Sequence, residues 1–213
     1  MRQFTLFDQI ICRFDHIIKA IPEIRLSKGS ADHRLSSEKT ENLSAAERQH
    51  SASLMRVNHS GEVCAQALYL GQAFVSRNQN LAKQLFQAAD EEKTHLRWCA
   101  NRIHALGDRT SLLNPLWALG SFGIGVIAGL AGDKISLGFL AETEQQVTQH
   151  LIKHQAEISE NDKESIKILK QMQIDEERHA IHAIAEGGVV LPKSVCFAMS
   201  CISKVMTITA RYI

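Results

Sequence analysis

Apolar residues recur along this chain at intervals of three and four, the spacing that places side chains on one face of a helix. The first such segment covers residues 4–21, and its apolar positions are Phe7, Ile10, Ile11, Phe14, Ile17, Ile18 and Ile21. Pro22 ends this segment, and the residues after it are polar and serine-rich. We therefore predict an N-terminal amphipathic helix within residues 1–24 and a polar linker at 25–43.

The remaining residues carry the start and stop signals of several long helices. Ser44 followed by Glu47 is a capping box, which marks a helix start, and Gly107 suits a helix end. Asn161, three residues before Glu164, can cap a later helix. The predicted helices cover about 44–77, 81–106, 133–159 and 162–186, and a last apolar segment follows Pro192 at 194–210.

An uncharged stretch lies between the second and third of these helices. Thr110 to Gly132 holds 23 residues (132 − 110 + 1) without Asp, Glu, Lys or Arg. Its length alone would suit a transmembrane helix. Gly125 and Gly129 have the four-residue spacing that lets two helices pack closely. The glycines do not form a dinucleotide-binding fingerprint, because no strand precedes them.

The composition favours one all-α domain over residues 44–213. The chain has 213 residues, of which 45% are hydrophobic, and such a chain can bury a core without disulfide staples. Its 24 basic and 23 acidic residues give a net charge of +1, unlike a nucleic-acid-binding protein. The five cysteines are odd in number and contain no Cys-x-x-Cys pair, so we expect reduced thiols in the cytoplasm.

A repeated Glu-x-x-His motif carries the candidate chemistry. Two copies begin at Glu92 and Glu176, which are 84 residues apart (176 − 92), and each has another glutamate, Glu62 or Glu144, about 30 residues upstream. These matched spacings indicate one helical hairpin used twice. A third copy at Glu47 is set aside, because 15 residues of helix (62 − 47) separate it from Glu62 by about 22 Å.

Two such hairpins would bring six metal ligands to the middle of one bundle. Residues three apart share a helix face, and a Glu from each of two helices with Glu-x-x-His from each of the others is the di-iron carboxylate arrangement. Four carboxylates balance two divalent cations, and ligands without thiolate favour iron or manganese. We therefore predict a ferritin-like four-helix bundle with ligands Glu62, Glu92, His95, Glu144, Glu176 and His179.

Two of these assignments have competitors next to them in the sequence. Glu142 competes with Glu144, and Glu144 is preferred because it shares a helix face with Val147 and Leu151. Glu91 competes with Glu92 in the same way.

Four further residues are assigned to the surroundings of the ligands. We expect Glu91 and Asp175 to hydrogen-bond the outer ring nitrogen of the histidine on the opposite hairpin. Tyr69 lies on the ligand face of its helix, where a phenol near the site and a core tyrosine are equally good explanations. His150, with His154 beside it on the third helix, is expected at the surface or behind the ligands.

Four segments around these positions resemble a known family. The most specific is Met55-Arg56-Val57-Asn58-His59-Ser60-Gly61-Glu62, followed by Tyr69, and the others are Glu91 to His95, Thr143 to Val147 and Asp175 to His179. They resemble the demethoxyubiquinone hydroxylases of ubiquinone biosynthesis over roughly residues 50–213. The resemblance implies one iron on Glu62 and His95, a second iron on Glu144 and His179, and bridging by Glu92 and Glu176.

The resemblance also implies the reaction and its participants. The chain would hydroxylate the ring of 2-polyprenyl-3-methyl-6-methoxy-1,4-benzoquinol with O₂ at two iron ions. NADH would be the ultimate reductant, and its electrons would arrive from a partner or through the quinone because the chain has no nucleotide fingerprint. Expected partners are other ubiquinone-biosynthesis proteins and a second copy of the chain, on the cytoplasmic side of a bacterial inner membrane.

A polyprenyl substrate requires contact with lipid, so we expect the uncharged segment at 110–132 to contact the membrane. A single crossing by residues 110–132 would leave Glu62 and Glu144 on opposite sides of the membrane. We therefore predict an interfacial helix that enters one leaflet, with residues 194–210 as a second membrane-associating segment. A buried crossover helix or a dimer interface is the alternative.

Two other functions stay open at this point. The same bundle could handle iron or peroxide, as ferritin-like and rubrerythrin-like proteins do, although rubrerythrin-like proteins need the missing Cys-x-x-Cys pairs. A metal-free scaffold of a membrane-bound biosynthetic complex is the third function considered.

Overall fold

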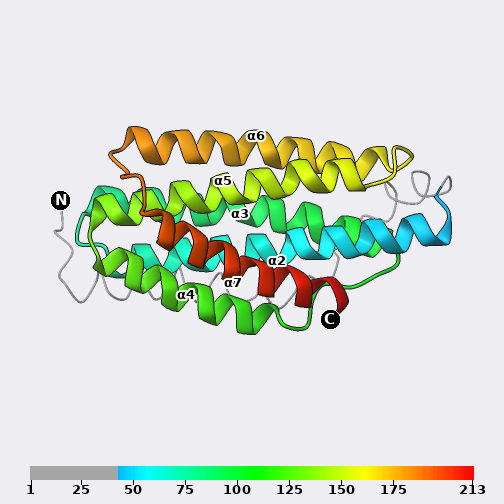
Figure 1. The fold of residues 1–213 in the computed structure, drawn as a ribbon, viewed down its shortest axis with the longest axis horizontal. Coiled ribbons are helices and arrows are strands. Elements are labelled where there is room, and N and C mark those ends of the chain that lie inside the picture. The colour runs from blue at the N-terminus through cyan, green and yellow to red at the C-terminus, as the bar shows by residue number, and fades with distance from the viewer. Residues whose placement is uncertain (1–42) are drawn as a thin grey trace, which may run out of the picture.

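The computed structural model describes residues 43–213, which form six helices and no strand (Figure 1). The predicted N-terminal helix and nearly all of the predicted linker lie outside the described residues. The helices are α2 (Ala45–Val75), α3 (Gln79–Ala105), α4 (Asn114–Leu130), α5 (Asp133–Glu157), α6 (Lys163–Ala185) and α7 (Lys193–Tyr212). The all-α prediction is confirmed for this part of the chain.

Two helical hairpins form the bundle. Helices α2 and α3 are one hairpin, α5 and α6 are the other, and the hairpins meet where α2 contacts α5 and α3 contacts α6. Helix α4 links the two hairpins and lies along α2, and α7 also packs on α2 (Figure 1). The bundle therefore places the midpoints of four helices around one axis.

The helix starts follow from capping. Ser44 and Glu47 form the predicted capping box, with Ser44 N donating to Glu47 Oε2 at 2.8 Å and Glu47 N donating to Ser44 Oγ at 3.2 Å. The prediction of Asn161 as the cap of α6 is wrong. Asp162 is the cap, accepting from Ser165 N at 3.0 Å, and it also forms a buried ion pair with Arg102 at 2.5 Å. The carboxylate of Asp162 can both accept a hydrogen bond at the helix start and form an ion pair with Arg102. The neutral amide of Asn161 could not form that ion pair.

Close contact between α2 and α4 depends on glycine. A Cβ on Gly125 would lie 2.1 Å from the carbonyl oxygen of Leu68, and a Cβ on Gly71 would lie 2.2 Å from that of Phe122. A Cβ on Gly129 would lie 2.5 Å from Val75 Cγ2. The predicted role of Gly125 and Gly129 in close packing is confirmed.

Two apolar clusters fill the bundle on either side of its middle. One contains Leu81, Leu85, Leu137 and Leu140, and the other contains Leu54, Ile103, Leu151 and Leu169. The polar residues described below lie between the two clusters. Among the described helices, none combines the length and apolar character needed to span a bilayer.

Candidate metal centre

Six polar side chains converge at the middle of the bundle, and each of its four helices contributes. Glu62 comes from α2, Glu92 and His95 from α3, Glu144 from α5, and Glu176 and His179 from α6. Their ligand atoms form two groups in which all atoms lie within 4.8 Å of one another: Glu62, Glu92, His95 and Glu176, and Glu92, Glu144, Glu176 and His179. Glu92 and Glu176 belong to both groups.

The four carboxylates are almost completely shielded from solvent. Glu62, Glu92, Glu144 and Glu176 have exposed fractions of 2%, 0%, 1% and 1%. Glutamate is rarely buried unless it is paired or coordinates a metal. Burial of four carboxylates at one point therefore requires compensating positive charge.

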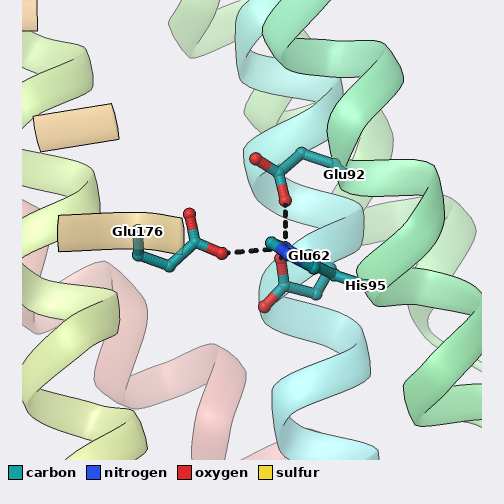
Figure 2. Close-up of side chains that lie close together, drawn as sticks. All are labelled: Glu62, Glu92, His95 and Glu176. Carbon is teal, nitrogen blue, oxygen red and sulfur yellow. Dashed lines mark hydrogen bonds and ion pairs between the residues drawn. The ribbon is translucent and has the colours of Figure 1, made fainter. Parts of the chain in front are cut away.

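Both histidines turn one ring nitrogen toward the cluster and the other away from it. His95 Nδ1 lies 2.9 Å from Glu176 Oε1 and 3.1 Å from Glu92 Oε2 (Figure 2). His179 Nδ1 lies 3.1 Å from Glu176 Oε2. The inward nitrogen of each ring is thus the one in position to bind a cation.

The outward nitrogens contact carboxylates of the opposite hairpin. His95 Nε2 lies 3.3 Å from Asp175 Oδ2, and His179 Nε2 lies 2.8 Å from Glu91 Oε2. These are the crossed contacts expected from the sequence. A carboxylate that accepts a hydrogen bond from Nε2–H fixes the ring orientation and leaves the lone pair on Nδ1.

Burial and mutual contact shift the pKa values of the glutamates and histidines in this cluster. Burial and the charge of Glu176 raise the pKa of Glu144 to about 8, and burial and the same neighbour raise that of Glu92. Burial acts against ionisation of Glu176, but hydrogen bonds from His179 and His95 lower its pKa to about 2. Burial likewise opposes protonation of His179, yet contacts with Glu144 and Glu176 raise its pKa to about 11.

The donor set fits divalent cations. Within the described part of the chain, Glu92 Oε1 and Glu144 Oε2 are buried and make no hydrogen bond. Buried polar atoms without partners are uncommon in native proteins and indicate a missing ligand. Four carboxylates and two imidazoles suit iron or manganese better than structural zinc. The role of the six residues as ligands stays a prediction.

The structure distinguishes the predicted ligands from the other residues considered beside them. Glu142 is partly exposed and accepts a hydrogen bond from Gln146 at 2.6 Å, away from the cluster. The Tyr69 hydroxyl donates to Glu144 Oε1, and burial together with the charge of Glu144 raises the pKa of Tyr69. Tyr69 is therefore both a core residue and a direct neighbour of the cluster. Glu47 serves its helix cap, as described above.

His150 lies elsewhere, on the wall of a cavity of about 510 Å³. The cavity runs between α2, α4, α5 and α7, is lined mainly by apolar side chains, and includes Glu62 in its wall. The ring centroid of His150 is 3.9 Å from that of His154. The cavity thus connects one residue of the cluster to the surface covered by α4 and α7.

Sequence reasoning assigned no role of their own to Asn58 and Trp117, which line this cavity. Asn58 could have been found, because it lies four residues before Glu62 and so on the same face of α2. Trp117 carried no such signal, because its position depends on how α4 lies against the bundle.

The fold and the cluster define a class: all-α bundle proteins with a buried carboxylate and histidine centre. A family profile described as "Ubiquinone biosynthesis protein COQ7" matches residues 49–210. Proteins named 3-demethoxyubiquinol 3-hydroxylase from Legionella pneumophila strain Corby and Acinetobacter baumannii strain ACICU are each 46% identical to the chain, over 215 and 214 residues. Both alignments cover 100% of this chain and of the relative. The chain belongs to the COQ7 family of ubiquinone biosynthesis proteins.

Proposed function

We propose that the chain is a monooxygenase that hydroxylates the ring of a polyprenyl methoxy-methyl benzoquinol, with O₂ as co-substrate and two iron ions as cofactor. The observation that carries the proposal is the pair of overlapping ligand groups that share Glu92 and Glu176. Two groups with shared carboxylates match the ligand set of di-iron bundles. The full-length similarity to proteins named 3-demethoxyubiquinol 3-hydroxylase supports the choice of substrate.

The protein's own groups have defined tasks in this reaction. Glu62 and His95 would hold one iron, Glu144 and His179 the other, and Glu92 and Glu176 would bridge. Bound iron would supply the activation of O₂ and the transfer of one oxygen atom to the ring. Asp175 and Glu91 hold the imidazoles in orientation through Nε2. Tyr69 keeps one proton at Glu144 Oε1 inside a site that the apolar clusters shield from water.

The cavity favours hydroxylation of a bound organic molecule over iron storage or peroxide removal. It has an apolar wall and a volume within the range of small-molecule sites, and it reaches Glu62. Storage of iron and decomposition of peroxide have no use for such a cavity. A quinol ring held there would lie against the first of the two ligand groups.

We also infer that the enzyme works at the surface of a membrane. Leu116, Leu119 and Ile127 of α4 are exposed, as are Phe197, Val205 and Ile208 of α7, and both helices border the cavity. Helix α7 carries three basic residues and no acidic one, which suits anionic lipid. A peripheral position on the cytoplasmic side of the inner membrane would let a polyprenyl tail remain in lipid, and NADH would be the ultimate reductant.

Metal analysis and a hydroxylation assay test the proposal together. The purified chain, loaded with ferrous iron under anaerobic conditions, should bind two ions. When O₂ is admitted, each loaded chain should hydroxylate one demethoxy quinol, because the two ferrous ions would supply the two electrons that take the second oxygen atom to water. Glu176→Ala should abolish the conversion with the helical content retained, because the residue belongs to both ligand groups. Glu177→Ala is the matched control, since its side chain is exposed. Normal quinone production in cells that depend on Glu176→Ala would overturn the assignment.

A further inference from the structure

Three buried nitrogen atoms on the wall of the cavity have no hydrogen-bond partner in the described part of the chain. They are Asn58 Nδ2, Trp117 Nε1 and His150 Nε2. Buried donors are almost always paired in native proteins. Their presence around one apolar cavity indicates that a ligand pairs with them.

Asn58 has the most clearly defined geometry of the three. The residue is 3% exposed, and its Oδ1 lies 2.9 Å from His154 Nδ1. In this contact Asn58 Oδ1 accepts from His154 Nδ1–H, and the Nδ2 amide group is left as an unpaired donor. Asn58 is one helical turn before Glu62, and both residues line the cavity.

Trp117 approaches the same cavity from α4. The indole Nε1 can only donate a hydrogen bond, so its ligand must supply an acceptor. The indole also packs against Val57 and Met206, which holds the ring between α2 and α7. One residue of α2 and one of α4, each with an unpaired donor, therefore line the same cavity.

The chemistry of these groups specifies the ligand. Donors in an apolar cavity favour an uncharged molecule with several acceptor oxygens, because a charge there would lose its hydration. A benzoquinol that carries a methoxy group and two ring oxygens meets this requirement. An alkyl group in place of the methoxy group would leave a buried donor unpaired. An unpaired donor discriminates between two ligands more strongly than a small difference in apolar contact does.

We propose that Trp117 and Asn58 are positioning residues that donate hydrogen bonds to oxygen substituents of the substrate ring, and that they select alkoxy-substituted over alkyl-substituted quinones. This inference rests on the proposed function for the identity of the ring. It concerns binding alone, so it can be measured apart from turnover, on the metal-loaded chain without O₂.

Two quinones without a polyprenyl tail provide the probes: a dimethoxy-methyl benzoquinone and tetramethyl benzoquinone. Binding of each to the full chain is measured by calorimetry in detergent. The unmodified chain should prefer the dimethoxy compound, although the tetramethyl compound is more apolar. Equal or tighter binding of the tetramethyl compound would overturn the proposal without any variant.

Trp117→Phe keeps an aromatic ring and removes the donor. We expect affinity for the dimethoxy compound to fall about 5- to 10-fold, the effect of one hydrogen bond, and affinity for the tetramethyl compound to change by less than about 2-fold. An equal loss for both compounds would show that the indole acts only through packing. The chain has two tryptophans, so Trp98→Phe leaves Trp117 as the only tryptophan, and the bound quinone should quench its fluorescence.

A matched pair of variants separates positioning by Asn58 from its contact with His154. Asn58→Leu and His154→Phe both remove that contact, but only Asn58→Leu removes the amide that faces the cavity. Selectivity for the dimethoxy compound should fall in Asn58→Leu and persist in His154→Phe, and equal losses would assign Asn58 a structural role. A chain that binds selectively but does not hydroxylate the quinol would refute the proposed function and leave this inference standing.

Discussion

Glu92 and Glu176 are the residues on which the candidate site is centred, because each approaches both histidines. Glu176 lies 2.9 Å from His95 and 3.1 Å from His179, and Glu92 lies 3.1 Å from His95 and 3.7 Å from His179. The two hairpins therefore supply equivalent residues from opposite sides. This symmetry is what the 84-residue repeat in the sequence encodes (176 − 92).

Replacement of an outer carboxylate should weaken metal binding without removing a ligand. Asp175→Asn leaves all six ligands in place but weakens the hold on His95 Nε2. Outer partners of metal-bound histidines typically contribute 10- to 100-fold in affinity, and we expect a loss of about that size. Competition with a chelator measures it, and Glu177→Gln on the exposed face is the control. Unchanged affinity in Asp175→Asn would contradict the orienting role.

His59 should make the folded state sensitive to acid. The side chain is fully buried and accepts a hydrogen bond from Asn114 at 3.2 Å, and burial, followed by the charge of His104, lowers its pKa to about 4 from 6.5. Between pH 6.5 and about 4, the imidazole of His59 therefore binds a proton in the unfolded chain but stays neutral in the folded chain. The stabilisation is complete above pH 6.5 and is lost as the pH falls toward 4, by about 3 kcal/mol in total.

The measurement is the free energy of unfolding by urea at pH 7 and pH 5. His59→Gln keeps a neutral acceptor, and the decrease in stability between these two pH values should be about 2 kcal/mol smaller in this variant than in the unmodified chain. The difference between the two chains isolates His59 from the other histidines. Parallel pH profiles would show that folding does not lower the pKa of His59.

Individual residues could be assigned from the sequence where a periodicity constrained them. Glu144 was separated from Glu142 by the helix face that it shares with Val147, and the structure buries Glu144 and leaves Glu142 partly exposed. The cap of α6 could not be chosen correctly in this way. Asp162 is selected over Asn161 by Arg102, a residue 60 positions earlier whose proximity only the folded chain creates.

At the level of helices, the contact between α2 and α4 is the most sharply testable. Gly125→Ala would place a methyl group 2.1 Å from the carbonyl oxygen of Leu68, so the helices must separate. We expect a loss of about 1–3 kcal/mol of stability, typical of overpacking, measured by urea denaturation. Gly123→Ala is the matched control on the same helix, because its Cβ would meet nothing within 4 Å.

The control has an expected sign of its own. Alanine favours helix over glycine by up to about 1 kcal/mol, so Gly123→Ala should be neutral or stabilising. Equal destabilisation by both substitutions would mean that α4 does not lie against α2 as described.

The start of α2 and the end of α3 were predictable because capping residues and glycines are local signals. Ser44 and Glu47 began α2 as expected, and Gly107, with a φ of 83°, ended α3 in the left-handed conformation that glycine adopts readily. The positions of α4 and α7 relative to the bundle were not predictable in this way. They depend on contacts between distant segments, and so the cavity and Trp117 appeared only in the structure.

For the molecule as a whole, large exposed apolar side chains are more numerous on α4 and α7 together than on α6. Helices α4 and α7 border the cavity, and α6 lies across the bundle from α4 (Figure 1). The main chain ties the two cavity helices together, because Leu112 N, just before α4, donates to Ile213 O at 3.1 Å. An amphipathic surface of this kind binds lipid in proportion to the apolar area that it buries. The cavity would then open toward the phase that holds a polyprenyl tail.

Substitutions of equal exposure on opposite sides of the bundle test this orientation. Leu119 on α4 is 73% exposed, Phe197 on α7 is 71% exposed and Ile181 on α6 is 71% exposed. Burial of one such side chain in lipid contributes roughly 1.5–3 kcal/mol, so Leu119→Ser or Phe197→Ser should reduce binding to anionic vesicles about 10-fold or more. Ile181→Ser removes the same kind of surface from α6 and should leave vesicle binding unchanged. Cosedimentation measures all three, and a loss in Ile181→Ser equal to that in Leu119→Ser would place the membrane contact elsewhere.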